Sequence, residues 1–195
     1  MKFAAIGCGV LALIIGVVVM IGVGGYNRLV SLDEGVDAAW GQVENVYQRR
    51  ADLIPNLVAT VKGAAEFERE TFTAVVEARA KVGQVNIENA PDAAQLAQFQ
   101  AAQDGLTSAL SRLLVVVERY PDLKATDAFR DLQVQLEGTE NRIATERHRY
   151  NEVARDFNTT RRAFPTVFIA NFFGFGEKAY FEAVEGAEAP PVVEF

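Results

Sequence analysis

The chain has 195 residues, half of them hydrophobic and 23% charged, a balance typical of one folded domain and not of a disordered chain. Its 19 basic and 26 acidic side chains give a formal net charge of −7, which matches a nucleic-acid backbone poorly, so we expect no nucleic-acid partner. One cysteine excludes an intrachain disulfide and a cysteine-built metal centre, and one histidine leaves few metal or acid–base arrangements.

Residues 1–25 are predicted to form a transmembrane anchor. No charged side chain occurs in residues 3–26, and the apolar core 4–23 supplies the ~20 residues that a helix needs to cross a hydrocarbon layer about 30 Å thick. Tyr26 and Arg28 then provide an aromatic and a basic anchor at the interface. The side of the membrane that the rest of the chain faces is weakly encoded, because basic residues are scarce at both ends of the span.

Two other interpretations of this segment fit the sequence less well. A cleaved signal peptide has a shorter apolar region and ends in a small-x-small site, whereas this run ends in Gly-Gly-Tyr-Asn at residues 24–27. Residues 5–8 look like a lipoprotein processing box, but such a box follows an apolar helix and Cys8 precedes one, so we expect Cys8 to be a small buried residue. Small-residue faces on which such spans pack together are predicted at Gly7, Gly9, Gly16 and Gly22.

The residues that follow, 26–163, are predicted to form an all-α helical bundle. Apolar side chains recur with the 3.5 to 3.6 period of long helices and coiled coils, and nowhere is there the sustained alternation of a strand. Proline-containing breaks separate the runs, and Thr126 is a capping residue for the last one. The four amphipathic runs cover residues 29–50, 57–82, 96–117 and 129–157, and the breaks fall at Pro55, residues 89–92, Pro121 and Pro165.

Pro55 leaves two arrangements open. Inside a helix a proline frees a backbone carbonyl and costs ~3 kcal/mol or more, while at a turn it opens the next helix. We favour a turn, which gives an antiparallel up-down-up-down bundle of four long helices with Phe164 beside the membrane. The alternative is one long kinked helix that packs with two further helices, and its membrane-proximal half is then buried only by oligomerisation.

Residues 164–187 form an aromatic-rich carboxy-terminal segment. Seven of the 13 phenylalanines fall in the last 32 residues, and basic residues flank the uncharged stretch, as in an interfacial membrane anchor. We favour a packing role, in which the rings close the open end of the bundle; membrane-surface contact and a partner-binding patch are the alternatives. Residues 188–195 are expected to be a flexible tail. The candidate membrane or partner contacts are Phe168, Phe172, Phe173, Phe175, Tyr180 and Phe181.

Side chains that carry catalysis or bind metals are sparse. A di-iron site in a helical bundle needs paired Glu-x-x-His motifs, but position 145 is threonine and His148 has no second histidine to join it. Carboxylates three or four residues apart are common on solvated helix faces. We therefore expect no enzymatic activity, cofactor or metal. The acidic pairs considered are Glu137 with Glu140, Asp33 with Asp37, and Glu66 with Glu70.

Polar residues on the inner stripe of the bundle predict interhelical ion pairs instead. Arg50, Asn56, Glu140, Asn141 and Arg142 all lie close to apolar core positions. A buried charge must be paired, and pairing fixes the register of neighbouring helices. The residues expected to form these structural pairs are Arg50, Glu140 and Arg142.

Several longer strings stand out between residues 26 and 183. They are Tyr-Asn-Arg-Leu-Val at 26–30, Arg-Arg-Ala-Asp-Leu-Ile-Pro-Asn-Leu-Val at 49–58, Tyr-Pro-Asp-Leu-Lys-Ala at 120–125, Thr-Glu-Asn-Arg-Ile at 139–143, Tyr-Asn-Glu at 150–152, Phe-Pro at 164–165, Phe-Gly-Phe at 173–175 and Tyr-Phe-Glu-Ala at 180–183. In this order and spacing they closely resemble the LemA family of bacterial membrane proteins. A departure is the placing of Gly35, Gly41 and Gly138 inside predicted helices.

The resemblance implies one amino-terminal membrane helix and a helical bundle on the cytoplasmic or periplasmic side of a bacterial plasma (inner) membrane. It carries no catalytic residue or cofactor. A LemA-like domain in a magnetosome membrane protein favours a role in membrane organisation. We expect a single-pass, non-enzymatic scaffold or adaptor whose partners are the lipid bilayer and further copies of itself. The alternative is a module that recruits an enzyme such as a membrane protease through its bundle or aromatic tail.

Overall fold

The computed structural model describes residues 2–62, 69–87 and 89–182, with the backbone alone at positions 2–8 and 12. These residues form helices and connecting segments without a strand, which confirms the all-α prediction. The flexible tail expected at 188–195 lies outside the described residues. The helices are α1 (Lys2–Lys62), α2 (Arg69–Val82), α3 (Ala93–Val117), α4 (Pro121–Lys124), α5 (Asp127–Arg162) and α6 (Thr166–Phe173).

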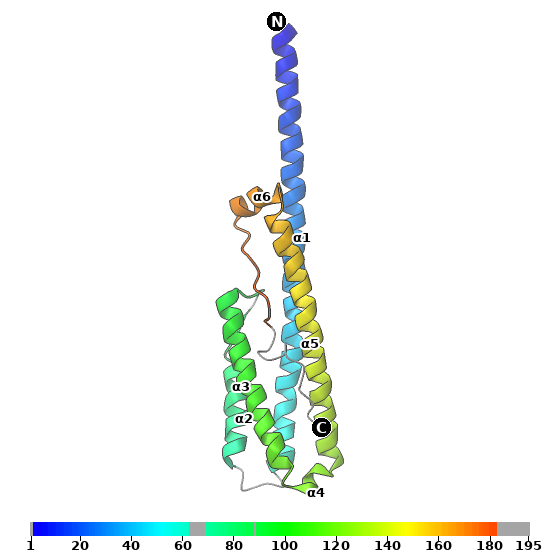
Figure 1. Cartoon of the computed structure of the whole chain (residues 1–195), viewed down its shortest axis with the longest axis vertical. Coiled ribbons are helices and arrows are strands. Elements are labelled where there is room, and N and C mark those ends of the chain that lie inside the picture. Colours follow the sequence, from blue (N-terminus) through cyan, green and yellow to red (C-terminus); the bar gives the residue numbers. More distant parts are fainter. Residues whose placement is uncertain (1, 63–68, 88, 183–195) are drawn as a thin grey trace, which may run out of the picture.

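Helices α1, α2, α3 and α5 form an elongated antiparallel bundle (Figure 1). From the N-terminus α1 runs the length of the molecule, α2 returns, α3 runs the other way again, and α5 comes back along α1. The main packing pairs are α1 with α5 and α2 with α3. Because α5 returns, Phe164 and the short helix α6 lie beside α1 where α1 emerges from the bundle, as the four-helix prediction requires.

The turn expected at Pro55 is wrong, because α1 passes through this residue and ends at Lys62. Pro55 has no N–H to donate to the carbonyl of Ala51, four residues earlier. The Nε of Arg79, on α2, donates a hydrogen bond to that carbonyl at 3.0 Å. The buried positions also keep their helical spacing across the proline, from Ile54 to Leu57. A neighbouring helix thus supplies the hydrogen bond that the proline removes.

The chain breaks predicted on either side of α3 and α5 are confirmed. Asp92 accepts a hydrogen bond from the backbone N–H of Gln95 at 2.8 Å, and the Gln95 side chain accepts one from the N–H of Asp92 at 3.1 Å, forming a capping box. Thr126 Oγ1 accepts from the N–H of Phe129 at 3.3 Å and caps α5.

The interior divides into two apolar cores. The span-proximal core lies mainly between α1, α5 and the start of α3, and it is rich in rings, including Trp40, Phe99 and Tyr150. The distal core lies among all four bundle helices and is mainly aliphatic, with Leu57 and Leu113 among its fully buried residues. We use these two names for the corresponding halves of the bundle.

Candidate functional site

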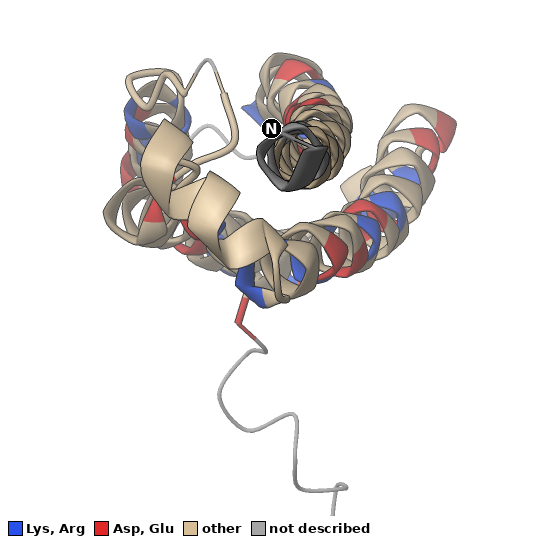
Figure 2. Ribbon diagram, turned by 90° about the horizontal axis from the view of Figure 1, so that it is seen from above, with Lys and Arg blue, Asp and Glu red and all other residues tan. Residues whose placement is uncertain are grey.

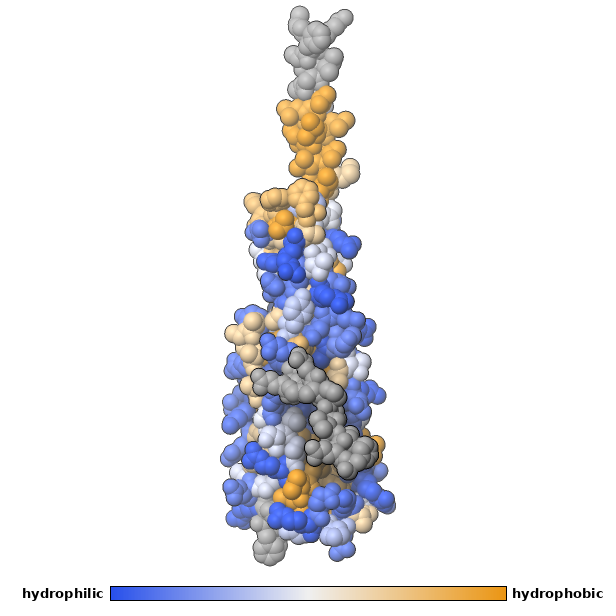
Figure 3. Space-filling model, viewed as in Figure 1, coloured by the Kyte–Doolittle hydropathy of each residue, from blue (hydrophilic) through white to orange (hydrophobic). Residues whose placement is uncertain are grey.

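The amino-terminal part of α1 projects from the bundle with its apolar side chains uncovered. Large hydrophobic side chains from Val10 to Val23 are 48–75% exposed, and the most apolar 18-residue window in this helix has no residue buried. Figure 3 shows this part of the chain as an apolar column above a largely hydrophilic body. In the part of the chain that the structure describes, one helix is long and apolar enough to cross a membrane, and it is α1.

Helix α6 packs against α1 just where the apolar column ends. The side chain of Ile169 fills the space over Gly25, where an added Cβ would lie 2.5 Å from Ile169 Cδ1. Ala170 is fully buried, and the ring of Phe173 lies 4.7 Å from that of Tyr26. Gly25 and Tyr26 therefore provide the seat on which α6 rests.

Exposed rings gather on α6 and on the turn just before it, and we call this cluster the aromatic shoulder: Phe164, Phe168, Phe172 and Phe173. Their side chains are 82%, 66%, 83% and 57% exposed, respectively. Phe168 and Phe172 are four residues apart and share a face of α6. Phe164 comes four residues before Phe168, in the turn that precedes α6, and its ring lies 6.0 Å from that of Phe168. Phe164 was not among the candidates from the sequence, although this spacing points to it.

The remaining aromatic candidates lie in the strap, the extended segment 175–182 that follows α6. Phe181 is only 4% exposed and packs in the span-proximal core, with its ring 5.4 Å from Tyr150 and 6.1 Å from Trp40. Phe175 is half-buried between Tyr26 and Phe157. The packing role that the sequence left open therefore applies to Phe181, which is not available to a membrane or a partner.

Two asparagines on one face of α5 hold the backbone of the strap. Asn151 accepts from the N–H of Phe181 and donates to its carbonyl, each at 2.9 Å. Seven residues on, Asn158 does the same with Lys178 at 2.9 Å and also donates to Tyr180 Oη. A side-chain amide can serve both a backbone donor and a backbone acceptor, as a neighbouring strand would.

Charged residues add to the binding of the strap. Arg161 Nε donates to the carbonyl of Phe175 at 2.6 Å. Arg147 donates to the carbonyl of Glu182 at 2.8 Å, and its guanidinium lies 4.7 Å from the centre of the Phe181 ring. Lys178 forms an ion pair with Asp33 of α1 at 2.6 Å. The strap thus connects α5 to α1 and takes the place of a further helix in the span-proximal half.

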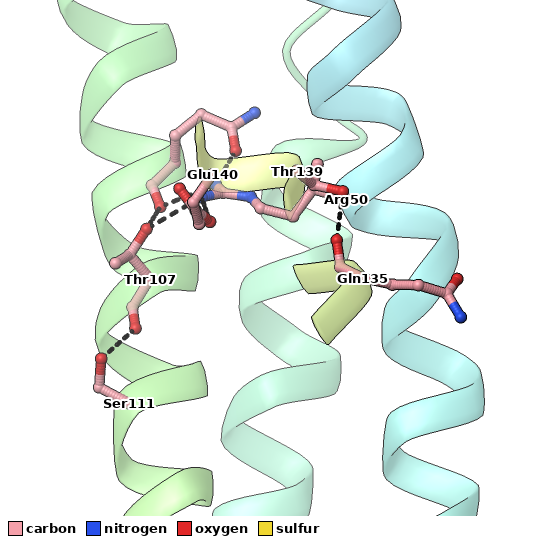
Figure 4. A network of polar contacts seen from close by, with 7 residues as sticks. Arg50, Thr107, Ser111, Gln135, Thr139 and Glu140 are labelled. Atoms are coloured by element: carbon pink, nitrogen blue, oxygen red, sulfur yellow. Dashed lines mark hydrogen bonds and ion pairs between the residues drawn. The ribbon is translucent and has the colours of Figure 1, made fainter. Parts of the chain in front are cut away.

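A polar layer lies between the two apolar cores. Figure 4 shows its contacts. At its centre is Arg50, which is 2% exposed and whose Nη1 lies 2.8 Å from Glu140 Oε1 on α5. Nη1 also donates to Thr107 at 3.1 Å, while Nη2 donates to the side chain and the backbone carbonyl of Gln103. Thr139, which directly precedes Glu140 on α5, is buried and donates to the carbonyl of Gln135 at 2.7 Å.

The ion pair of Arg50 with Glu140 confirms part of the prediction for the inner stripe, but the other polar residues predicted there are not in the layer. Asn56, Asn141 and Arg142 are exposed, and Arg142 forms no ion pair with any residue that the structure describes. Burial raises the pKa of Tyr47, one turn from Arg50, above its usual value, and the positive charges of Arg147 and Arg50 partly oppose this rise. A single buried arginine with partners on two helices fixes their register.

The remaining ionisable candidates have structural partners or face solvent. His148 is 77% exposed, with Nδ1 3.8 Å from Glu152 Oε2. Asp37 accepts from the backbone N–H of Ala90 at 2.9 Å. Glu66 lies outside the described residues. Among those that the structure does describe, no three His, Cys, Asp or Glu side chains are grouped so that they could hold a metal ion.

A cleft of about 600 Å³ opens beside the polar layer, between α1, α2 and α3. Tyr47, Arg79, Phe99 and Gln103 are among the residues that line it. Glu44 also lines it, and partial burial raises the pKa of this carboxyl. The cleft is open to solvent and is lined by both polar and apolar side chains, which suits a peptide side chain better than an enclosed small molecule.

Fold and site together define an all-α protein in which one candidate membrane span continues into an antiparallel bundle. The chain belongs to the LemA family, whose model matches residues 39–195. This confirms the resemblance seen in the sequence.

Relatives of known name fall into two groups. "Magnetosome protein MamQ 2" of Paramagnetospirillum magneticum is 27% identical over 184 residues, which cover 85% of this chain and 67% of the relative. "Magnetosome protein MamQ" of Magnetospirillum gryphiswaldense is 25% identical with the same coverage. "Protein LemA" of Metamycoplasma hominis is 24% identical over 173 residues, covering 89% of this chain and 76% of the relative.

Proposed function

We propose that the protein is a non-enzymatic scaffold or adaptor, anchored by one helix in the plasma (inner) membrane of a bacterium, that associates with copies of itself. The observation that carries this proposal is the continuity of α1, which runs for 61 residues from the apolar column into the bundle. A membrane anchor and a bundle that share one helix cannot swing independently. Such a molecule holds its bundle at a set distance and orientation from the bilayer, as a scaffold requires.

Small residues in the apolar column support self-association. Gly9 and Gly16 are seven residues apart on one face of α1, and an added Cβ at either would meet nothing within 4 Å. In lipid, close approach of helices at small residues drives association because apolar side chains gain nothing by leaving the hydrocarbon. The names of the magnetosome relatives are consistent with a role in organising membranes.

The mass of the full-length protein in mild detergent, measured by light scattering, tests this proposal. We expect an oligomer, and we expect Gly16→Val to lower its mass because the added methyl groups hold the helices apart. Val18→Phe adds bulk on the opposite face of the same helix and is the matched control. A monomer at all concentrations would contradict self-association, and equal effects of both substitutions would place the contact elsewhere.

A module that recruits another protein is the second candidate function. The cleft beside the polar layer favours it, because an opening lined by Tyr47, Phe99 and Arg79 has the aromatic and arginine content of binding surfaces. Co-purification with the wild-type chain and with Gln48→Trp, which narrows the cleft, tests it. A partner lost from the variant supports recruitment, whereas an unchanged set of partners contradicts a role for the cleft.

A further inference from the structure

We propose that the aromatic shoulder is a second membrane contact, in which α6 lies in the lipid interface and fixes the tilt of the bundle against the bilayer. This inference rests on the proposed membrane anchoring by α1. In this arrangement the interfacial region of the membrane that the span crosses covers the exposed rings of Phe164, Phe168, Phe172 and Phe173.

The position of α6 along α1 is the first argument. Gly25 and Tyr26, on which α6 rests, come directly after the apolar run that ends at Val23. Two or three residues of helix amount to ~3–5 Å, which is less than the ~5–10 Å depth at which interfacial helices lie. If residues 4–23 fill the hydrocarbon layer, the shoulder is therefore at the boundary between acyl chains and headgroups.

The orientation of α6 is the second argument. In side view and from above, α6 lies across the direction of α1 and not along it (Figures 1 and 2). A helix set across a membrane-spanning helix lies in the plane of the membrane, which is the orientation of interfacial helices. It forms a ledge at the base of the apolar column, and the space-filling view shows the two apolar surfaces meeting there (Figure 3).

The composition of α6 is the third argument. Its eight residues carry no charge, and six of them are apolar. Ile169 and Ala170 pack against the protein, while Phe168 and Phe172 are exposed. An uncharged helix that exposes several large apolar side chains is normally covered, by protein or by lipid. Arg28 and Arg162 are exposed and come two residues after Tyr26 and two residues before Phe164, respectively, which suits contact with the headgroups of anionic lipids.

Lipid accounts for these rings better than a protein partner does, because the shoulder is continuous with the uncovered surface of the span. A protein partner that covered only the shoulder would still leave Tyr26, which contacts Phe173, at the edge of the bilayer, whereas lipid would cover both. Phenylalanine rings at the base of a span have the amphipathic surroundings of an interfacial belt.

Fluorescence quenching of the full-length protein in vesicles tests the inference. A Cys8→Ser background carries one new cysteine at a time, labelled with the environment-sensitive dye NBD, and the vesicles contain phosphatidylcholine and phosphatidylglycerol with spin-labelled lipids. Phe172→Cys reports on the shoulder, and Phe168→Cys repeats the test on the same helix face. Val18→Cys reports on the span, and Val134→Cys, which is 67% exposed in the distal half, reports on water.

We expect the label at Phe172 to lose about half of its fluorescence, more to a shallow spin label than to a deep one, as an interfacial position requires. Quenching at Val18 together with a water-like signal at Phe172 and Phe168 would overturn the inference and leave the anchor intact. A blue-shifted but unquenched label at both shoulder positions would show protein covering them and would also overturn it. An unquenched label at Val18 would remove the proposed anchor and this inference with it.

Discussion

The two halves of the bundle form their apolar cores in different ways. The distal half has four helices around a mainly aliphatic core. The span-proximal half has α1, α5 and the beginning of α3, and it completes its core with rings and with the strap. There the backbone of the strap is held by Asn151 and Asn158 in place of helix-to-helix packing.

This difference shows how an extended segment can substitute for a helix. A strap contributes fewer apolar side chains per unit length than a helix does, so each must be large, and Phe181 fills the place opposite Trp40 and Tyr150. Its free backbone groups need partners inside the protein, which the two asparagines provide. The span-proximal half thus depends on a few specific contacts, whereas the distal half depends on many interchangeable ones.

Phe181→Ala is expected to have the largest effect, because it removes a buried ring from the core that has the fewest helices. We expect a loss of about 3–5 kcal/mol in the free energy of unfolding, measured by thermal and denaturant unfolding in detergent with circular dichroism. Phe172→Ala removes the same ring from an 83% exposed position and is expected to change stability by less than about 0.5 kcal/mol. Equal losses would show that the strap does not complete the core.

Substitutions of Arg50 test how much the polar layer, at the boundary between the halves, contributes to the free energy of unfolding. Arg50→Ala is expected to cost about 2–3 kcal/mol, because it removes packing and leaves Gln103 without a partner for its side chain. Arg50→Met keeps the volume and is expected to cost much less, since well-packed apolar groups often replace a buried ion pair without loss.

Glu140→Gln removes the negative charge of the ion pair with Arg50 but keeps nearly the same side-chain shape. Arg50 is buried but Glu140 is half exposed, so solvent weakens their attraction, and we expect a loss of about 1 kcal/mol. In the Arg50→Met background the same substitution is expected to have no effect. A full additive loss in the double variant would show that the two side chains are not coupled.

Alkaline pH is expected to weaken the span-proximal half first. Burial raises the pKa of Tyr150 above its ordinary value of about 10, with smaller contributions from Asp37 and Tyr180. A pKa that is higher in the folded state gives stability that is complete below pH ~10 and is lost as the pH rises through the folded pKa, by up to ~1.4 kcal/mol per pH unit.

The variant Tyr150→Phe tests this assignment. Tyr150 Oη has no hydrogen-bond partner among the residues that the structure describes, so its removal is expected to leave stability at pH 7 nearly unchanged. The midpoint of thermal unfolding should then fall less steeply between pH 10 and pH 11.5 than in the wild type. A parallel fall in both proteins would assign the alkaline transition to other groups.

The sequence predicts the periodic parts of this molecule well and its irregular parts poorly. Apolar spacing defines α3 and α5 and the buried positions of α1, because those residues meet their partners along regular helices. The same spacing predicts the inner position of Arg50 and identifies Glu140 as a candidate for its ion-pair partner. The asparagine contacts to the strap had no signal of this kind, since Asn151 and Asn158 have the spacing of any polar pair on a helix.

Pro55 shows most clearly why a local rule can fail. The cost of a proline in a helix comes from a carbonyl that is left without a donor, and the sequence around Pro55 offers no replacement. The replacement is Arg79, which lies 28 positions from Ala51 along the chain and on another helix. Only the packing of α2 beside α1 brings the two together, so the outcome depends on tertiary structure.

A double-mutant cycle between Pro55 and Arg79 measures this compensation and is expected to give a small coupling energy, about 1 kcal/mol. Arg79→Met alone should destabilise the protein, because it leaves the Ala51 carbonyl without a donor in a partly buried place. In a Pro55→Ala background the backbone N–H of the new alanine can bond to that carbonyl, so Arg79→Met should then cost little. Arg112→Met, on the exposed side of α3, controls for the loss of a surface charge. If Arg79→Met costs the same with and without the proline, its hydrogen bond does not explain why α1 continues through Pro55.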